Sequence, residues 1–148
     1  MNIVYNIKTC NDNEIFFHLK ECDNNFIPPL STRVDLRDFS KKIYEKTITF
    51  EAWSETILVG LVSCYYNDPE NRSGFINNVS IIKNYMGKGI AANLLNMSID
   101  YAKQNNIVEV KLEVSNNNIA AILLYKKIGF VDLSYKGEFI VMKYILAV

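Results

Sequence analysis

The sequence predicts a mixed α/β fold, and three local patterns indicate it. Alternating apolar and polar residues mark strands, apolar residues three or four positions apart mark amphipathic helices, and a glycine-rich turn joins a strand to a helix. A chain of 148 residues is long enough for one domain with one core. We therefore expect a single domain over residues 1–148.

The N-terminal part predicts one strand followed by two helices. The segment NIVYNIK (residues 2–8) is typical of a strand. Residues 11–22 and 33–45 each place apolar side chains on one helical face. Between them, Pro28 and Pro29 block a helix, and the Ser and Thr that follow are suited to capping the second one. We therefore expect a loop between the two helices.

The middle of the chain predicts three strands. Alternation over residues 48–52 and an apolar run over residues 57–66 indicate a hairpin, and the turn NDPEN leads to a third strand over residues 74–82. In that strand the alternation slips at Asn77 and Asn78. The slip indicates either a β-bulge, which redirects backbone groups beside functional sites, or a simple strand end.

The last part predicts a helix, a strand, a short helix and two strands. Helical spacing runs from Gly87 to Gln104, and residues 108–114 alternate without a fault. Asn118 is a predicted N-cap and Gly129 a predicted C-cap of the short helix. Strands over residues 130–133 and 139–146 follow. The order βααβββαβαββ predicts a mixed sheet with a parallel crossover around the glycine turn.

Composition excludes several classes of partner. Sixteen basic residues balance sixteen acidic ones, so no strong field favours nucleic acid or an anionic membrane. No apolar run approaches the roughly 20 residues that cross a bilayer, and the N-terminus lacks the features of a secretion signal, so we expect a cytoplasmic protein. Three widely spaced cysteines predict buried free thiols and no metal site.

The turn at Gly87 and Gly89 predicts a phosphate site. The first amides of a helix lack partners and carry a partial positive charge, and glycines let an anion approach the backbone. Lys88 adds a counter-charge or is simply solvated. The segment Gly87–Ala92 also fits the dinucleotide fingerprint G-x-G-x-x-A, with Glu113 as its acid, but some four strands precede it where the dinucleotide fold has one. A Walker motif fails because Gly89 follows Lys88.

Residues 79–130 resemble the GNAT family, the GCN5-related N-acetyltransferases. The family turn R/Q-x-x-G-x-G/A lies at Met86-Gly87-Lys88-Gly89-Ile90-Ala91, with Met86 in place of the usual Arg or Gln. The pattern N-x-x-A-x-x-L-Y-x-K-x-G-F matches at Asn118, Ala121, Leu124, Tyr125, Lys127, Gly129 and Phe130. Both motifs stand at the family separation, on the predicted elements.

The resemblance implies acetyl-CoA as co-substrate, no metal, and a sheet that splays between its fourth and fifth strands. The implied coenzyme-binding residues are Val79, Ser80, Ile81, Met86, Gly87, Lys88, Gly89, Ile90, Ala91, Asn118 and Tyr125. Among these, backbone groups of Val79 and Ile81 pair with the pantetheine arm. Because methionine donates no hydrogen bond, Met86 leaves pyrophosphate binding more dependent on backbone amides, with weaker affinity expected.

The implied reaction is direct acetyl transfer to a primary amine of a small molecule or peptide in a ternary complex. Glu113 is the candidate base, through water or with a raised pKa, and its alternative is a solvated place on the strand. Tyr125 is the candidate acid for the leaving thiolate; without the motif it is a core aromatic. A catalytically silent acetyl-CoA-binding sensor or interaction module is the alternative function, and a nucleotide-binding oxidoreductase fragment is a third.

Topology places the acceptor amine beside loops and strand ends. We expect Phe26, Ser31, Tyr65, Asn67, Asn77 and Asn78 to line that side. His18, the only histidine, is expected to be structural and partly exposed. The sequence leaves the identity of the amine open, since variable loops build such pockets. The apolar segment Phe139–Leu146 offers a strand for pairing between two subunits, which would give a homodimer.

Overall fold

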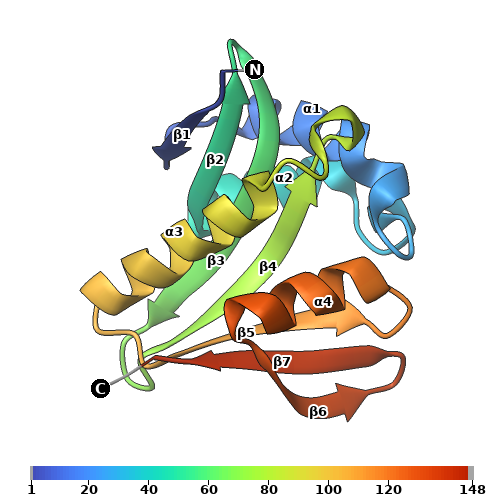
Figure 1. Cartoon of the computed structure of the whole chain (residues 1–148). Coiled ribbons are helices and arrows are strands. Elements are labelled where there is room, and N and C mark those ends of the chain that lie inside the picture. The colour runs from blue at the N-terminus through green and yellow to red at the C-terminus, as the bar shows by residue number, and fades with distance from the viewer. Residues whose placement is uncertain (1, 147–148) are drawn as a thin grey trace.

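The computed structural model describes residues 2–146 and confirms the predicted class and order of elements (Figure 1). Three short 3₁₀ turns, Asp23–Asn25, Leu30–Thr32 and Lys83–Tyr85, lie between the main elements. Those elements are β1 Val4–Ile7, α1 Asp12–Cys22, α2 Leu36–Lys46, β2 Ile48–Ser54, β3 Ile57–Asp68, β4 Ser73–Ile81, α3 Ile90–Gln104, β5 Glu109–Ser115, α4 Ile119–Ile128, β6 Val131–Lys136 and β7 Phe139–Ile145.

The strands of the described residues form one seven-stranded sheet in the order β1-β2-β3-β4-β5-β7-β6. Neighbouring strands are antiparallel except β4 and β5, which are parallel and are joined through α3. A parallel pair needs such a crossover, as the sequence predicted. Strand β7 lies between β5 and β6, with both of its edges paired. Its apolar sequence therefore does not provide the free edge on which the predicted subunit pairing relied.

The sheet splays between β4 and β5, which confirms the predicted opening. The parallel register runs from Ser73, opposite Glu109, to Ile76, opposite Leu112. Beyond that point β4 continues to Ile81 and β5 to Ser115 without further pairing between their described residues. In Figure 1 the two strands meet at the lower left and diverge to the right. The opening leaves one edge of the last part of β4 free.

The predicted β-bulge is present at the start of the opening. Ser63 of β3 pairs with Asn78 and Cys64 pairs with Ile76, so Asn77 is the extra residue. The alternative, a simple strand end, is wrong because β4 runs on to Ile81. A bulge bends its strand and increases local twist, which accounts for β4 leaving β5 at this point.

Helices cover both faces of the sheet. Helix α3 packs on β2, β3 and β4 through buried residues at helical spacing, including Leu94, Leu95 and Ile99. On the opposite face, Ile15 and Leu19 of α1 and Ile43 of α2 pack against β3. Burying each such apolar side chain stabilises the fold by about 1.5–3 kcal/mol. This burial holds α3 on one face of the sheet, and α1 and α2 on the other, in place around the opening.

Capping residues decide where the helices begin. Asn11 forms a capping box with Glu14 at the start of α1. The predicted start of α2 at Arg33 is wrong, because the Asp35 side chain accepts the Asp38 amide and the helix begins at Leu36. An acceptor at the N-cap stabilises a helix by about 1 kcal/mol. Residues 33–35, which follow the 3₁₀ turn Leu30–Thr32, therefore remain a loop beside the opening.

Candidate active site

The turn before α3 presents unpaired amides. Gly87 and Gly89 have φ angles of +74° and +80°, which favour glycine. Gly89 is the N-cap of α3 and has no side-chain cap among the described residues. The first intrahelical bond runs from the Asn93 amide to the Gly89 carbonyl over 3.0 Å. The three preceding amides thus face the turn with the partial positive charge of the helix N-terminus.

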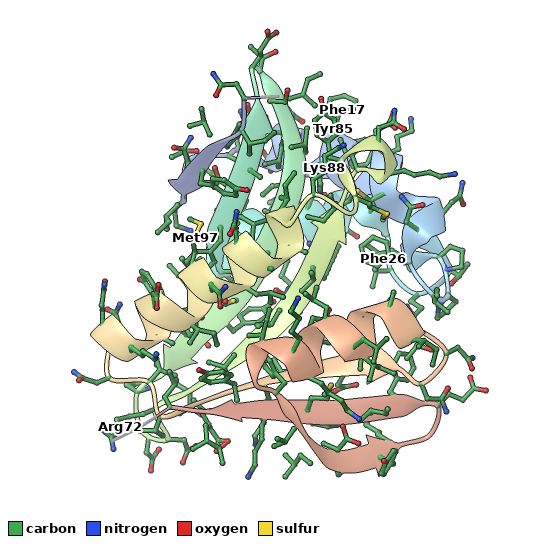
Figure 2. The ribbon with its side chains drawn as sticks, viewed as in Figure 1. Phe17, Phe26, Arg72, Tyr85, Lys88 and Met97 are labelled. Atoms are coloured by element: carbon green, nitrogen blue, oxygen red, sulfur yellow. The ribbon has the colours of Figure 1, made fainter. Side chains whose placement is uncertain are left out.

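The first cavity, of about 530 Å³, extends from this turn along the free edge of β4 to α4. Ten of the eleven residues that the sequence assigned to coenzyme binding line it. The exception is Lys88, whose side chain is exposed on the turn (Figure 2). The lining consists of Cys22, Asn25, Phe26, Val79, Ser80, Ile81, Tyr85, Met86, Gly87, Gly89, Ile90, Ala91, Ala92, Asn118, Ala120, Ala121, Leu124 and Tyr125.

The edge of β4 that faces this cavity offers backbone hydrogen bonds. The Ile82 amide donates to the Val59 carbonyl of β3 over 2.8 Å. Because successive residues of a strand direct their backbone groups to opposite sides, the amides and carbonyls of Val79 and Ile81 point into the opening. An extended chain entering the opening would find an edge to pair with.

The first cavity carries no charged side chain on its described lining. Met86 stands at the turn, 46% exposed, where the family pattern has an Arg or Gln. Burial raises the pKa of the Cys22 thiol to about 12, so this cysteine stays protonated at neutral pH. Positive potential in the cavity therefore comes from the amides at the start of α3.

The second cavity, of about 380 Å³, lies on the α1–α2 side of the opening. Four phenylalanines, one from each of four separate segments, form its walls: Phe26, Phe39, Phe75 and Phe139. Figure 2 shows Phe26 at the wide end of the opening between β4 and α4. The residues on this lining with polar side chains are Arg33, Asn77, Asn78, Glu113, Ser115, Asn118 and Tyr125.

The two cavities meet at four residues: Phe26, Val79, Asn118 and Tyr125. Tyr125 of α4 is 7% exposed, and no described residue hydrogen-bonds its hydroxyl. Burial raises the pKa of the Tyr125 phenol above its ordinary value. The phenol therefore stays neutral at physiological pH and keeps a proton to donate at the junction.

Glu113 is the one carboxylate on the described lining of either cavity. It projects from β5, is exposed to solvent, and lies 3.9 Å from Nζ of Lys136. A solvated ion pair of this kind contributes little to stability. The carboxylate is thus open to the second cavity and to water.

The predicted acceptor-side residues divide into two groups. Phe26, Asn77 and Asn78 line the second cavity. The Ser31 amide and hydroxyl donate instead to the Asp23 carboxylate, at 2.7 and 2.6 Å, which ties the loop after α1 together. Tyr65 and Asn67 lie on β3, outside the described lining of both cavities. Their roles stay predictions.

A buried network that sequence reasoning missed supports this site. His18 is 2% exposed, not partly exposed as expected, because it shares a helical face with Ile15, Leu19 and Cys22. That spacing was the signal that could have revealed its burial. Its Nδ1 lies 2.8 Å from the Leu58 carbonyl and its Nε2 lies 2.8 Å from Oγ of Ser80. Burial lowers its pKa to about 4, so the ring is neutral.

Three further findings concern the described residues as a whole. Their helices include none with the length and apolar character of a membrane span. Their His, Cys, Asp and Glu side chains form no cluster of three or more that is suited to a metal ion. The three cysteines are free and buried, as predicted.

Comparison with known proteins places the chain in a family. The profile of the Acetyltransferase (GNAT) family matches residues 13–130. A probable spermine N(1)-acetyltransferase of Bacillus subtilis subsp. natto is 28% identical over 149 residues, covering 93% of this chain and 97% of that protein. N-alpha-acetyltransferase 30 of Schizosaccharomyces pombe is 30% identical over 100 residues, covering 62% of this chain and 67% of that protein.

A solved structure shares the fold over almost the whole chain. The PaiA N-acetyltransferase of Thermoplasma acidophilum, in complex with coenzyme A, has a TM-score of 0.78 and 14% identity, covering 99% of this chain and 100% of that chain. The family profile covers most of the chain, and the fold of an N-acetyltransferase covers almost all of it. The chain therefore belongs to the GNAT family of acetyltransferases.

Proposed function

We propose that the chain is an acetyl-CoA-dependent N-acetyltransferase that acetylates a primary amine of a small molecule or peptide by direct attack in a ternary complex. The observation that carries this proposal is the meeting of two cavities at Phe26, Val79, Asn118 and Tyr125. One cavity suits an anionic, extended donor, and the other suits an amine with an apolar body. Their junction is where the reacting groups would meet.

The residues of the first cavity fit the coenzyme. Amides at the start of α3 would hold the pyrophosphate, and Gly87 and Gly89 keep side chains away from it. Backbone groups of Val79 and Ile81 would pair with the pantetheine arm, and Asn118 and Leu124 lie along its path. The bound acetyl-CoA supplies an acetyl group activated as a thioester.

The second cavity must deliver an amine in its neutral form. A primary alkylamine has a pKa of about 10.4, so it carries a proton at neutral pH and has no free electron pair. Glu113 is placed to receive that proton through water, since its carboxylate is exposed and lines this cavity. The deprotonated nitrogen would then attack the carbonyl carbon from the α1–α2 side.

Tyr125 and Val79 would act where negative charge develops. The Val79 amide points into the opening and would stabilise the carbonyl oxygen as it becomes an oxyanion. As the carbon–sulfur bond breaks, the Tyr125 hydroxyl would donate a hydrogen bond to the departing thiolate. Because burial raises the pKa of this phenol, the stabilising interaction is this hydrogen bond, and the released thiolate takes its proton from solvent.

Release of free thiol from acetyl-CoA tests the proposal. We expect the native chain to release coenzyme A with at least one member of a panel of primary amines. Replacing Tyr125 by phenylalanine should reduce kcat by about 100-fold, the lower range for loss of one hydrogen-bond donor to charge that develops in the transition state. Tyr135→Phe, at a tyrosine that is 72% exposed on β6, is the matched control and should keep full activity.

One outcome would contradict the proposed function, and another would contradict the role given to Tyr125. Tight binding of acetyl-CoA without turnover on any amine would favour the silent binding module. Full activity of Tyr125→Phe, with coenzyme affinity unchanged by calorimetry, would remove Tyr125 from the chemistry.

A further inference from the structure

Two buried amide atoms beside the second cavity have no hydrogen-bond partner among the described residues. They are Oδ1 of Asn78 and Nδ2 of Asn77. Both residues belong to the bulge of β4, and both line the second cavity. Asn78 is only 4% exposed. A buried polar atom without a partner destabilises the fold, so such atoms in residues that line a cavity point to a ligand that supplies the missing partners.

The orientation of the Asn78 amide follows from its partners. The carbonyl of Leu61, at 3.2 Å, can only accept, so the nitrogen of Asn78 must face it. The same nitrogen donates to Oγ of Ser80 over 2.9 Å. Both amide hydrogens are then used, and Oδ1 of Asn78 remains as a free acceptor.

The histidine behind Ser80 holds this arrangement in place. The carbonyl of Leu58 only accepts, so Nδ1 of His18 carries the hydrogen. Because the ring is neutral, Nε2 accepts the hydroxyl hydrogen of Ser80, whose oxygen is left to accept from Asn78. The hydrogens on Nδ1 of His18, on Oγ of Ser80 and on Nδ2 of Asn78 are thus assigned, and the Cys22 thiol lies farther from Nε2, at 3.7 Å. His18 and Ser80 are positioning residues for the Asn78 oxygen.

Asn77 presents the opposite chemistry. Its Oδ1 lies 2.6 Å from Oγ of Ser63, a separation typical of an O–H···O bond and short for N–H···O. The oxygen therefore faces Ser63, and Nδ2 keeps two unshared hydrogens. The bulge sets an acceptor and a donor on adjacent residues at one cavity.

The apolar walls of the second cavity and its small number of charges indicate which kind of side chain the ligand carries. Four phenylalanines line it, and Arg33 and Glu113 are its only charged residues among those described. A polyamine, with several positive charges, would meet one carboxylate that already lies near Lys136. An apolar or aromatic side chain would bury its surface against the phenylalanine rings.

From these features we propose that the acceptor is an α-amino carbonyl compound with an apolar side chain, that is, an amino acid or a peptide N-terminus of that kind. Oδ1 of Asn78 accepts a hydrogen from the amine, and Nδ2 of Asn77 donates to the neighbouring carbonyl or carboxylate oxygen. The side chain lies among the phenylalanine rings. The proposal rests on the acetyltransferase function above and names its substrate class.

The test compares acceptors that differ by one group. Thiol release is measured with phenylalaninamide and with phenethylamine, which lacks the carbonyl. For each protein, the ratio of kcat/KM for phenylalaninamide to kcat/KM for phenethylamine gives its preference for the acceptor with a carbonyl. Comparing this preference between the wild type and Asn77→Asp cancels the difference in pKa between the two amines, since both proteins are tested with the same pair. We expect Asn77→Asp to lower the preference for phenylalaninamide by about tenfold, because an acceptor oxygen replaces the donor. Asn77→Leu, which removes the donor without adding charge, should lower it too.

Further measurements distinguish an amino acid from a peptide as the acceptor, and they show whether a negative result concerns this inference alone or also the acetyltransferase function. Free phenylalanine against a phenylalanyl tripeptide distinguishes an amino acid from a peptide N-terminus. Asn96→Leu, at an exposed position of α3, should leave the ratio unchanged. An unchanged ratio in both Asn77 variants, or spermine as the best acceptor, would overturn this inference and leave the acetyltransferase function standing. No thiol release with any amine would overturn both.

Discussion

At the scale of single residues, we expect Met86 to limit how strongly the pyrophosphate is held. It lines the first cavity where a donor is usual in the family, and the described lining carries no charge. We predict that Met86→Arg tightens coenzyme A binding by about tenfold, because a charged donor to phosphate contributes about 1.5 kcal/mol. Isothermal titration calorimetry measures the change. The affinity of this variant should also fall more steeply with added salt.

Met86→Leu is the control for that experiment, since it changes shape but adds no charge. Its affinity should stay close to that of the native chain. An arginine variant that binds coenzyme A no better than the leucine variant would show that the pyrophosphate lies elsewhere.

Single residues also show where sequence reasoning ends. Asn77 and Asn78 were predicted on the acceptor side from topology, and the slip in the alternation of their strand predicted the bulge that contains them. The His18–Ser80–Asn78 network was not predicted, because it joins positions far apart in the chain. Local spacing reveals a face of a helix, but it does not reveal which strand lies under that face.

At the scale of elements, the start of α3 depends on the left-handed conformation of Gly89. We predict that Gly89→Ala weakens coenzyme A binding by about tenfold, because the added methyl group would stand between the pyrophosphate and the amides that begin α3. The same methyl group costs about 1–2 kcal/mol of backbone strain, which lowers the stability of the fold. Calorimetry gives the affinity, and thermal unfolding gives the loss of stability.

Gly137→Ala supplies the matched control. Gly137 has a φ of +61°, and no described atom lies within 4 Å of an added Cβ, as at Gly89. It stands in the turn between β6 and β7, away from the first cavity. Equal losses of stability with a loss of affinity only in Gly89→Ala would support the role of the turn. Equal affinities in both variants would contradict it.

The elements themselves were largely predictable. The bulge, the parallel crossover and the opening of the sheet follow from patterns within short segments, or from the resemblance that these patterns carry. The start of α2 was misplaced because Ser31, Thr32 and Asp35 all resemble caps in sequence. In the fold Ser31 bonds to Asp23, and only Asp35 is left to cap α2.

At the scale of the whole molecule, stability should depend on the protonation of His18. Its pKa falls from 6.5 to about 4 on burial in the folded chain. Between these values the unfolded chain binds a proton that the folded chain does not, so lowering the pH favours unfolding. We predict a loss of about 2 kcal/mol in the free energy of unfolding between pH 7 and pH 5, measured by urea denaturation.

His18→Asn tests the assignment, because asparagine can still donate to the Leu58 carbonyl but does not titrate. Its unfolding free energy should be nearly constant over the same pH range. His18 is the only histidine, so an equal loss in the variant would place the titrating group elsewhere.

Below pH 4.5 both proteins should lose stability further. Burial opposes ionisation of Glu51, but hydrogen bonds from Thr49, Thr9 and Trp53 outweigh it and hold the pKa of Glu51 low.

The second cavity is lined by residues from segments far apart in the chain, and it was the feature least predictable from the sequence. Its phenylalanines come from positions 26, 39, 75 and 139, which only the complete fold brings together. The first cavity was predictable because two contiguous motifs carry most of its lining. This contrast explains why the sequence indicates the donor side of the reaction while the acceptor side needs the structure.

We place acetyl-CoA in the opening between β4 and β5, with its sulfur beside Tyr125. A crystal structure of the chain with coenzyme A bound would show the position of each part of the coenzyme. We expect pyrophosphate oxygens on the amides that begin α3, the pantetheine arm along Val79 and Ile81, and the sulfur within hydrogen-bonding distance of the Tyr125 hydroxyl. Coenzyme bound outside that opening, or a sulfur turned away from Tyr125, would contradict it.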